Sequence, residues 1–117
     1  MLLVQNGTKY GFLGENKIYI GREGRGLTAS ALANPFKIGE DGDRNEVIEK
    51  FRKWLWPQIK AWRTNGTKTP AIELILEIAA RVKRNRLVIL TCYCKPQGCH
   101  GDIIDRCIQW LIKEGLV

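Results

Sequence analysis

Three stretches of the chain place apolar residues at the three- and four-residue spacing of a helix that buries one face. The first covers residues 43–63, where Asp43 and Glu46 form the spacing of a capping box. Pro57 is expected to kink or end this helix near Trp56, because proline cannot donate the helical hydrogen bond. The second helix is expected to start at Thr69-Pro70, and the third to run from about residue 100 to about residue 114.

Short apolar runs outside these helices predict β-strands. Leu87–Leu90 is entirely apolar, which is typical of a strand covered on both faces. Residues 1–22 read as three short strands separated by turns at Asn6-Gly7 and at residues 14–16. The pattern therefore predicts an N-terminal β-hairpin or meander, with its strands at residues 1–5, 9–13 and 17–22.

Together these elements predict a single domain, residues 1–117, of the α/β class, either a compact three-layer fold or an open, Rossmann-like sheet. Ligands of such sheets bind beyond the carboxyl ends of the strands. The segment KIYIGR leads into a long loop at residues 23–42, and LVILTCYC leads into CHGD. If these two strands are parallel neighbours, both loops meet at one edge of the sheet.

Composition narrows the class of protein. The content of 44% hydrophobic and 26% charged residues is ordinary for a globular protein, and no apolar run is long enough to span a bilayer. The N-terminus lacks the features of a signal peptide, so we expect a cytoplasmic protein without membrane contact. In that reducing compartment, the four cysteines fit free thiols, metal ligands or core residues better than disulfides.

The chain is basic, with 19 Lys and Arg residues against 12 Asp and Glu residues and a net charge of +7. This excess fits an anionic partner, either a nucleic acid or a phosphorylated small molecule. A charged surface that only keeps the protein in solution would give the same excess. In the long loop, Arg22, Arg25 and Lys37 supply positive charge, and Asn34-Pro35-Phe36 predicts a rigid turn. The alternative is an ordinary surface loop.

The outer face of the first helix is also basic and carries Trp54 and Trp56. Aromatic side chains among cations bind single-stranded nucleic acid by stacking and phosphate contact. A solvated face with core tryptophans is the alternative, and it is the commoner situation. The basic residues of this face are Lys50, Arg52, Lys53, Lys60 and Arg63.

Three cysteines and the sole histidine lie within nine positions where the last strand is expected to meet the last helix. Zinc prefers four nitrogen or sulfur ligands, and Cys92, Cys94, Cys99 and His100 could supply them, although the spacing is unusual. Alternatively, Cys94 or Cys99 is a reactive thiolate at a helix start, with His100 and Asp102 assisting. A third interpretation is reduced thiols packed at the end of a strand.

The motifs YIGR, ALANPFKIG and CYCKPQGCHGDII resemble the domain-of-unknown-function family 4326, which is found in phages, bacteria and archaea. The resemblance extends from about residue 18 to residue 112, and it is most specific at Cys92–Asp102. The chain departs from the family pattern at Ala33, where glycine is usual, and at Phe51, where tyrosine is common. The resemblance implies a shared fold and a shared site built from the same segments, but no known reaction.

Three functional hypotheses follow. The first is a protein that binds a phosphorylated small molecule, specifically a nucleotide, and that could also act on it. In this hypothesis Arg22, Arg25 and Arg44 contact phosphate, Asn34 binds the ligand, and Cys94, Cys99, His100 and Asp102 carry any chemistry. The second is a zinc-stabilised nucleic-acid-binding module that uses the basic face, and the third is a phage- or plasmid-type interaction protein. The residues leave the oligomeric state open.

Overall fold

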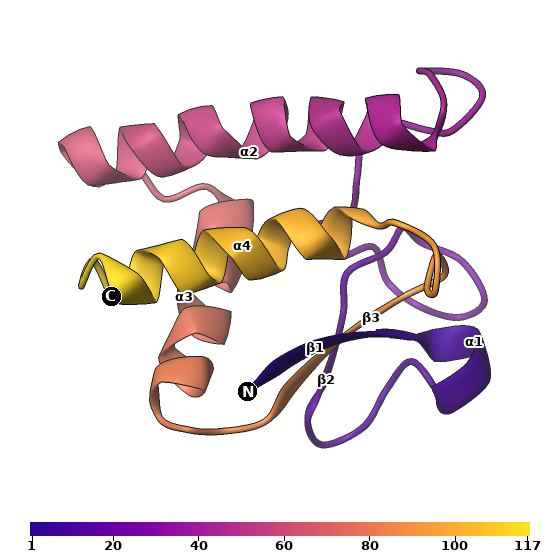
Figure 1. The fold of residues 1–117 in the computed structure, drawn as a ribbon, viewed down its shortest axis with the longest axis horizontal. Coiled ribbons are helices and arrows are strands. Elements are labelled where there is room, and N and C mark those ends of the chain that lie inside the picture. The colour runs from indigo at the N-terminus through magenta and orange to yellow at the C-terminus, as the bar shows by residue number, and fades with distance from the viewer.

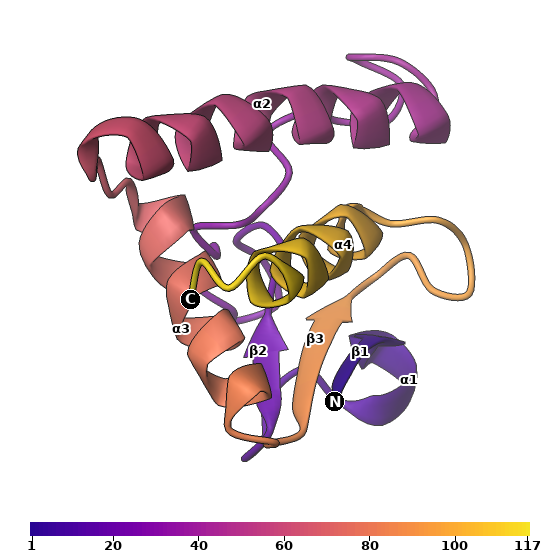
Figure 2. The same cartoon turned by 60° about the vertical axis from the view of Figure 1, so that its left-hand side comes forward.

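A three-stranded parallel sheet lies at the centre of the computed structural model, which describes residues 1–117. Its strands are β1 (Leu2–Asn6), β2 (Lys17–Tyr19) and β3 (Val88–Cys92), and their spatial order is β1-β3-β2. Both outer strands run parallel to β3, as Figure 2 shows for β2 and β3. The predicted α/β class is confirmed, and the sheet is parallel throughout.

The predicted N-terminal hairpin is wrong, because every strand pair in the sheet is parallel. The short helix α1 (Gly7–Tyr10) instead overlaps the start of the segment expected to form a second strand, residues 9–13. The Asn6 side chain accepts a hydrogen bond from the backbone N–H of Thr8 and so caps this helix rather than forming a hairpin turn. A Cβ on Gly7 would come within 2.1 Å of the Phe12 ring, so only glycine fits there.

The three long helices are α2 (Arg44–Asn65), α3 (Pro70–Lys83) and α4 (His100–Lys113). Asp43 caps α2 in a complete capping box with Glu46, as predicted. Of the two outcomes expected at Pro57, a kink or an end, the end near Trp56 is wrong, because the helix continues through Pro57 to Asn65. Leu55 and Ile59, on either side of the proline, are fully buried, and their packing offsets the lost hydrogen bond.

The hydrophobic core lies between one face of the sheet and the three long helices. In Figure 1, α4 runs between α2 and the sheet. Cys107 lies inside this core, as predicted, and burial raises the pKa of its thiol to about 12. The largest fully buried side chains are Phe51, Ile20, Leu32, Leu55, Ile59, Ile72, Ile75, Ile78, Leu90, Ile104, Ile108 and Leu111.

The opposite face of the sheet is covered by less of the chain. Phe12 packs its ring against Tyr19 and Tyr93, with ring centroids 5.7 and 4.7 Å away. The Thr91 hydroxyl donates a 2.9 Å hydrogen bond to the carbonyl of Phe12, which fastens this connection to the central strand. None of the helices has the length and apolar character needed to cross a membrane.

Candidate functional site

A pocket of about 550 Å³ opens beyond the carboxyl ends of β2 and β3. The loop after β2 forms part of its wall, and the start of α2, the segment after β3 and the start of α4 form the rest. The two loops expected to converge therefore do so, because β2 and β3 are parallel neighbours. We call this cavity the strand-end pocket; its lining includes Arg22, Arg25, Asn34, Phe36, Lys37, Ile38, Arg44, Cys92, Tyr93, Cys94, Cys99 and His100.

Two of the predicted ligand-binding residues hold the loop in place. The Arg22 guanidinium donates hydrogen bonds to the carbonyls of Asn34 and Phe36, at 3.0 and 2.7 Å. Asn34 is buried, and its side-chain amide donates to the Val47 carbonyl of α2 at 3.1 Å while accepting from the Phe36 N–H at 2.9 Å. Both side chains line the pocket, but most of their hydrogen-bonding capacity is used inside the protein.

The other cations of the pocket are less engaged. The Arg25 guanidinium lies 5.3 Å from the centroid of the Tyr93 ring, and Arg44 donates one 3.0 Å hydrogen bond to the Gly98 carbonyl. Lys37 is also part of the lining. Glu23 and Glu40 supply the only carboxylates there, against four Lys and Arg side chains. The charge of these side chains therefore favours an anionic ligand.

His100 is buried where α4 begins. Its Nε2 lies 2.7 Å from the carbonyl oxygen of Ile20, an arrangement that requires Nε2 to carry the proton and donate. Nδ1 is then the acceptor, 3.8 Å from the Cys99 sulfur. Burial lowers the pKa of the ring, so the imidazole is neutral near pH 7.

The three clustered cysteines are free thiols that line the same pocket. Cys92 and Cys99 are buried, whereas Cys94 is only half-buried. Hydrogen bonds from the thiols of Cys92 and Cys99, together with the nearby Arg44 guanidinium, lower the pKa of Cys94 well below its usual range. The neighbouring Cys92 and Cys94, together with burial, raise the pKa of Cys99, because one thiolate makes it harder to ionise a second beside it.

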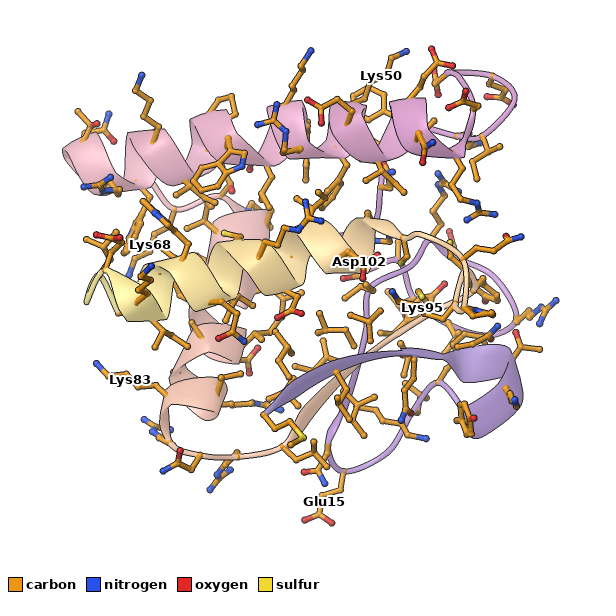
Figure 3. The ribbon with its side chains drawn as sticks, viewed as in Figure 1. Glu15, Lys50, Lys68, Lys83, Lys95 and Asp102 are labelled. Carbon is orange, nitrogen blue, oxygen red and sulfur yellow. The ribbon has the colours of Figure 1, made fainter.

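Asp102 is not part of the pocket lining. Its carboxylate accepts a 3.2 Å hydrogen bond from the Cys99 N–H and a 2.6 Å hydrogen bond from the Lys95 ammonium group. Figure 3 shows the side chains of Lys95 and Asp102 close together. It therefore caps α4, in a capping box with Cys99. Gly101 allows close packing, because a Cβ there would lie 2.8 Å from a methyl group of Val4.

The four residues predicted to bind zinc all line the strand-end pocket; they are Cys92, Cys94, Cys99 and His100. No group of three or more His, Cys, Asp or Glu side chains is placed so that it could hold a metal ion. His100 directs Nε2 to the carbonyl of Ile20, and its Nδ1 lies 3.8 Å from the Cys99 sulfur. Zinc binding stays a prediction from the sequence.

Tyr93 and Ile38 are pocket residues that the sequence did not single out. Tyr93 stands between Cys92 and Cys94, directly after β3, and its ring also packs against Phe12. Its exposure is 40%, which is high for a tyrosine flanked by cysteines at a strand end. An aromatic residue inside the CxC motif was the available signal for this part of the site.

Comparison with known proteins gives the chain a family. Residues 5–110 match the family described as "Domain of unknown function (DUF4326)", and the chain therefore belongs to it. The chain is also similar to an "Uncharacterized 12.4 kDa protein in nrdA-td intergenic region" of Enterobacteria phage T4, with 35% identity over 78 residues. That alignment covers 66% of this chain and 60% of the phage protein. No solved structure matches the chain.

Proposed function

We propose that this protein binds a phosphorylated small molecule of the nucleotide class in the strand-end pocket. One observation supports the proposal. Four Lys and Arg side chains and two aromatic rings line one cavity at the carboxyl ends of neighbouring parallel strands. A volume of about 550 Å³ is in the range of small-molecule sites. The position is the one where open α/β sheets bind ligands.

In this proposal, Arg25, Lys37 and Arg44 bind the phosphates. Each lines the pocket, and none forms a salt bridge within the protein. Arg22 and Asn34, which the sequence assigned to ligand contact, act mainly by holding the loop that carries the first two cations. The loop is therefore ordered before the ligand arrives, which reduces the entropy lost on binding.

The apolar part of the pocket suits a planar base. Phe36, Ile38 and Tyr93 lie among the lining residues, and the last two are exposed. Arg25 lies over the Tyr93 ring, so that a base inserted there meets an aromatic face beside a cation. Cys94 and His100 line the same cavity and are the groups to which we assign any reaction on the bound compound.

The test is a thermal-shift panel of nucleosides, nucleotides, inorganic phosphate and sugar phosphates, followed by calorimetric titration of the compounds that shift the melting temperature. A nucleotide at about 100 times its Kd should raise Tm by roughly 10 °C, since it stabilises the fold by about 2.7 kcal/mol. The double variant Arg25→Gln, Lys37→Gln should weaken binding at least tenfold, whereas the control Arg84→Gln, at the end of α3, should not.

The proposal fails if no phosphorylated compound shifts Tm, or if the double variant and the control bind equally well. Turnover is checked separately by incubating the best ligand with the protein and analysing the mixture by mass spectrometry. The variant Cys94→Ser should retain binding and lose any product. Product formation by this variant would remove Cys94 from the chemistry without affecting the binding proposal.

A further inference from the structure

A second depression of about 710 Å³ lies between the C-terminal half of α2 and α4, and it shares no lining residue with the strand-end pocket. In Figure 1 these two helices run side by side above the sheet. We call this depression the α2–α4 groove. Its lining consists of Trp56, Pro57, Ile59, Lys60, Arg63, Thr64 and Trp110.

The groove combines cations with indole rings and contains no carboxylate. Trp56 and Trp110 meet edge to face with centroids 5.2 Å apart, and both remain half-exposed. The Arg63 guanidinium lies 5.4 Å from the centroid of the Trp110 ring. Lys60 and Arg63 are exposed and form no salt bridge, so their charges are available to a partner.

The surrounding sequence reinforces this charge. Residues 50–72 contain six Lys and Arg residues and no Asp or Glu. Two of the six are engaged elsewhere, because Arg52 pairs with Glu49 and Lys50 donates to the Asp41 carbonyl. Lys50 also points away from α4 in Figure 3, so it cannot join the groove.

Three cations of α2 that form no salt bridge lie in one stripe along the helix, together with Trp56. Lys53, Trp56, Lys60 and Arg63 are spaced by three, four and three residues, which places them on one side of the helix. At 1.5 Å per residue the stripe is about 15 Å long. It is a line of positive charge with an aromatic pair beside it, which is the arrangement that binds an extended polyanion with exposed bases.

We propose that the α2–α4 groove binds single-stranded nucleic acid, with a base stacked against Trp56 or Trp110 and backbone phosphates on Lys53, Lys60 and Arg63. A duplex keeps its bases stacked inside and offers none to the indoles. An acidic peptide supplies charge without the planar rings that the tryptophan pair accommodates. The proposal concerns a different surface from the strand-end pocket and does not rest on the function proposed there.

The experiment is fluorescence anisotropy with a labelled oligothymidylate of about 15 nucleotides, titrated at several salt concentrations. Competitors are a duplex, a polyglutamate and an abasic deoxyribose-phosphate chain of equal charge. We expect the double variant Lys60→Gln, Arg63→Gln to weaken binding at least tenfold and to reduce the salt slope by about 1.4, since each single-strand phosphate contact contributes about 0.7. The control Arg84→Gln, Arg86→Gln removes the same charge from exposed positions outside the groove.

Stacking is tested with Trp110→Leu, which keeps an apolar side chain but removes the ring. This variant should bind the oligothymidylate at least about fivefold more weakly and the abasic chain as the wild type does. Circular dichroism and thermal melts check that each variant is folded, and Lys60→Gln, Arg63→Gln retains both indoles. The proposal is overturned if the oligothymidylate does not bind, if the control loses as much affinity as the groove variant, or if polyglutamate or the duplex competes equally well.

Discussion

Gly101 is the residue of the CHGD motif whose replacement best tests how α4 is seated on the sheet. A Cβ added at this position would lie 2.8 Å from a Val4 methyl group and 3.0 Å from the end of the Ile20 side chain. Alanine at this position must therefore push the first turn of α4 away from β1 or force Val4 out of its rotamer. Overpacking of this kind costs roughly 1–3 kcal/mol.

The opposing effect is helix propensity, which by itself favours alanine over glycine by up to about 1 kcal/mol. The contribution is smaller in the first turn, so we expect Gly101→Ala to reduce the free energy of unfolding by about 1–2 kcal/mol. For a chain of 117 residues, unfolding entropy near Tm is about 0.25 kcal/mol per degree, so the melting temperature should fall by roughly 4–8 °C.

The matched control is Gly98→Ala, three residues earlier and directly before the CHGD motif. A Cβ there would approach only one Ile48 methyl carbon, at 3.5 Å, which is an ordinary contact. This substitution should leave stability unchanged or raise it by about 0.5 kcal/mol, because it restricts the unfolded chain. Urea unfolding of both variants measures the difference. If Gly101→Ala is as stable as the wild type, or more stable, the packing of α4 described here is wrong.

Three shorter predictions concern the pocket. Limiting iodoacetamide on the native protein should label Cys94 first and Cys107 last. Cys94 is half-exposed and has a lowered pKa, whereas Cys107 is buried in the core. Peptide mapping that finds equal labelling of the cysteines would contradict this prediction. Because burial lowers the folded-state pKa of His100, its contribution to stability is complete above the unfolded pKa of about 6.5 and is lost as pH falls below it. The free energy of unfolding, measured with urea, should therefore fall by up to about 1 kcal/mol between pH 6.5 and 5.5 in the wild type. The fall should be smaller in His100→Gln. Asn34→Ala should cost about 2 kcal/mol, because it removes the hydrogen bond to the Val47 carbonyl and leaves the Phe36 N–H without its Asn34 acceptor. Hydrogen exchange should then show faster opening of the loop at residues 20–43, and unchanged protection would refute the role of Asn34 in fastening this loop.

The helices were predictable because their signals are local. The capping box at Asp43 and the N-cap at Thr69 involve residues three positions apart, and both are present as the sequence predicts. The hairpin prediction failed because strand pairing is not local: β1 pairs with β3, so that Leu2 lies beside Val88. An apolar run indicates a strand, but not which strand lies beside it.

The site was predictable to the level of segments and not to the level of contacts. Two loops at the ends of parallel strands must meet, so the convergence of the Arg22 loop and the CHGD segment followed from topology alone. Which side chain faces the cavity depends on partners that the sequence does not reveal. Asn34 is held by Val47 and Asp102 by Lys95, and neither pairing has a sequence signature. Trp110 reaches the α2–α4 groove through the packing of helices far apart in the chain.

One helix carries parts of both proposed sites, and this arrangement makes the two proposals separable. Arg44 reaches the strand-end pocket from the first turn of α2, whereas Lys60 lies 16 residues later in the α2–α4 groove. The rise of an α-helix places these two positions about 24 Å apart along the axis. Substitutions so far apart with no shared partners act additively. A variant that weakens oligothymidylate binding at the groove should therefore leave nucleotide binding in the pocket unchanged, and coupled losses would show that a single site binds both ligands.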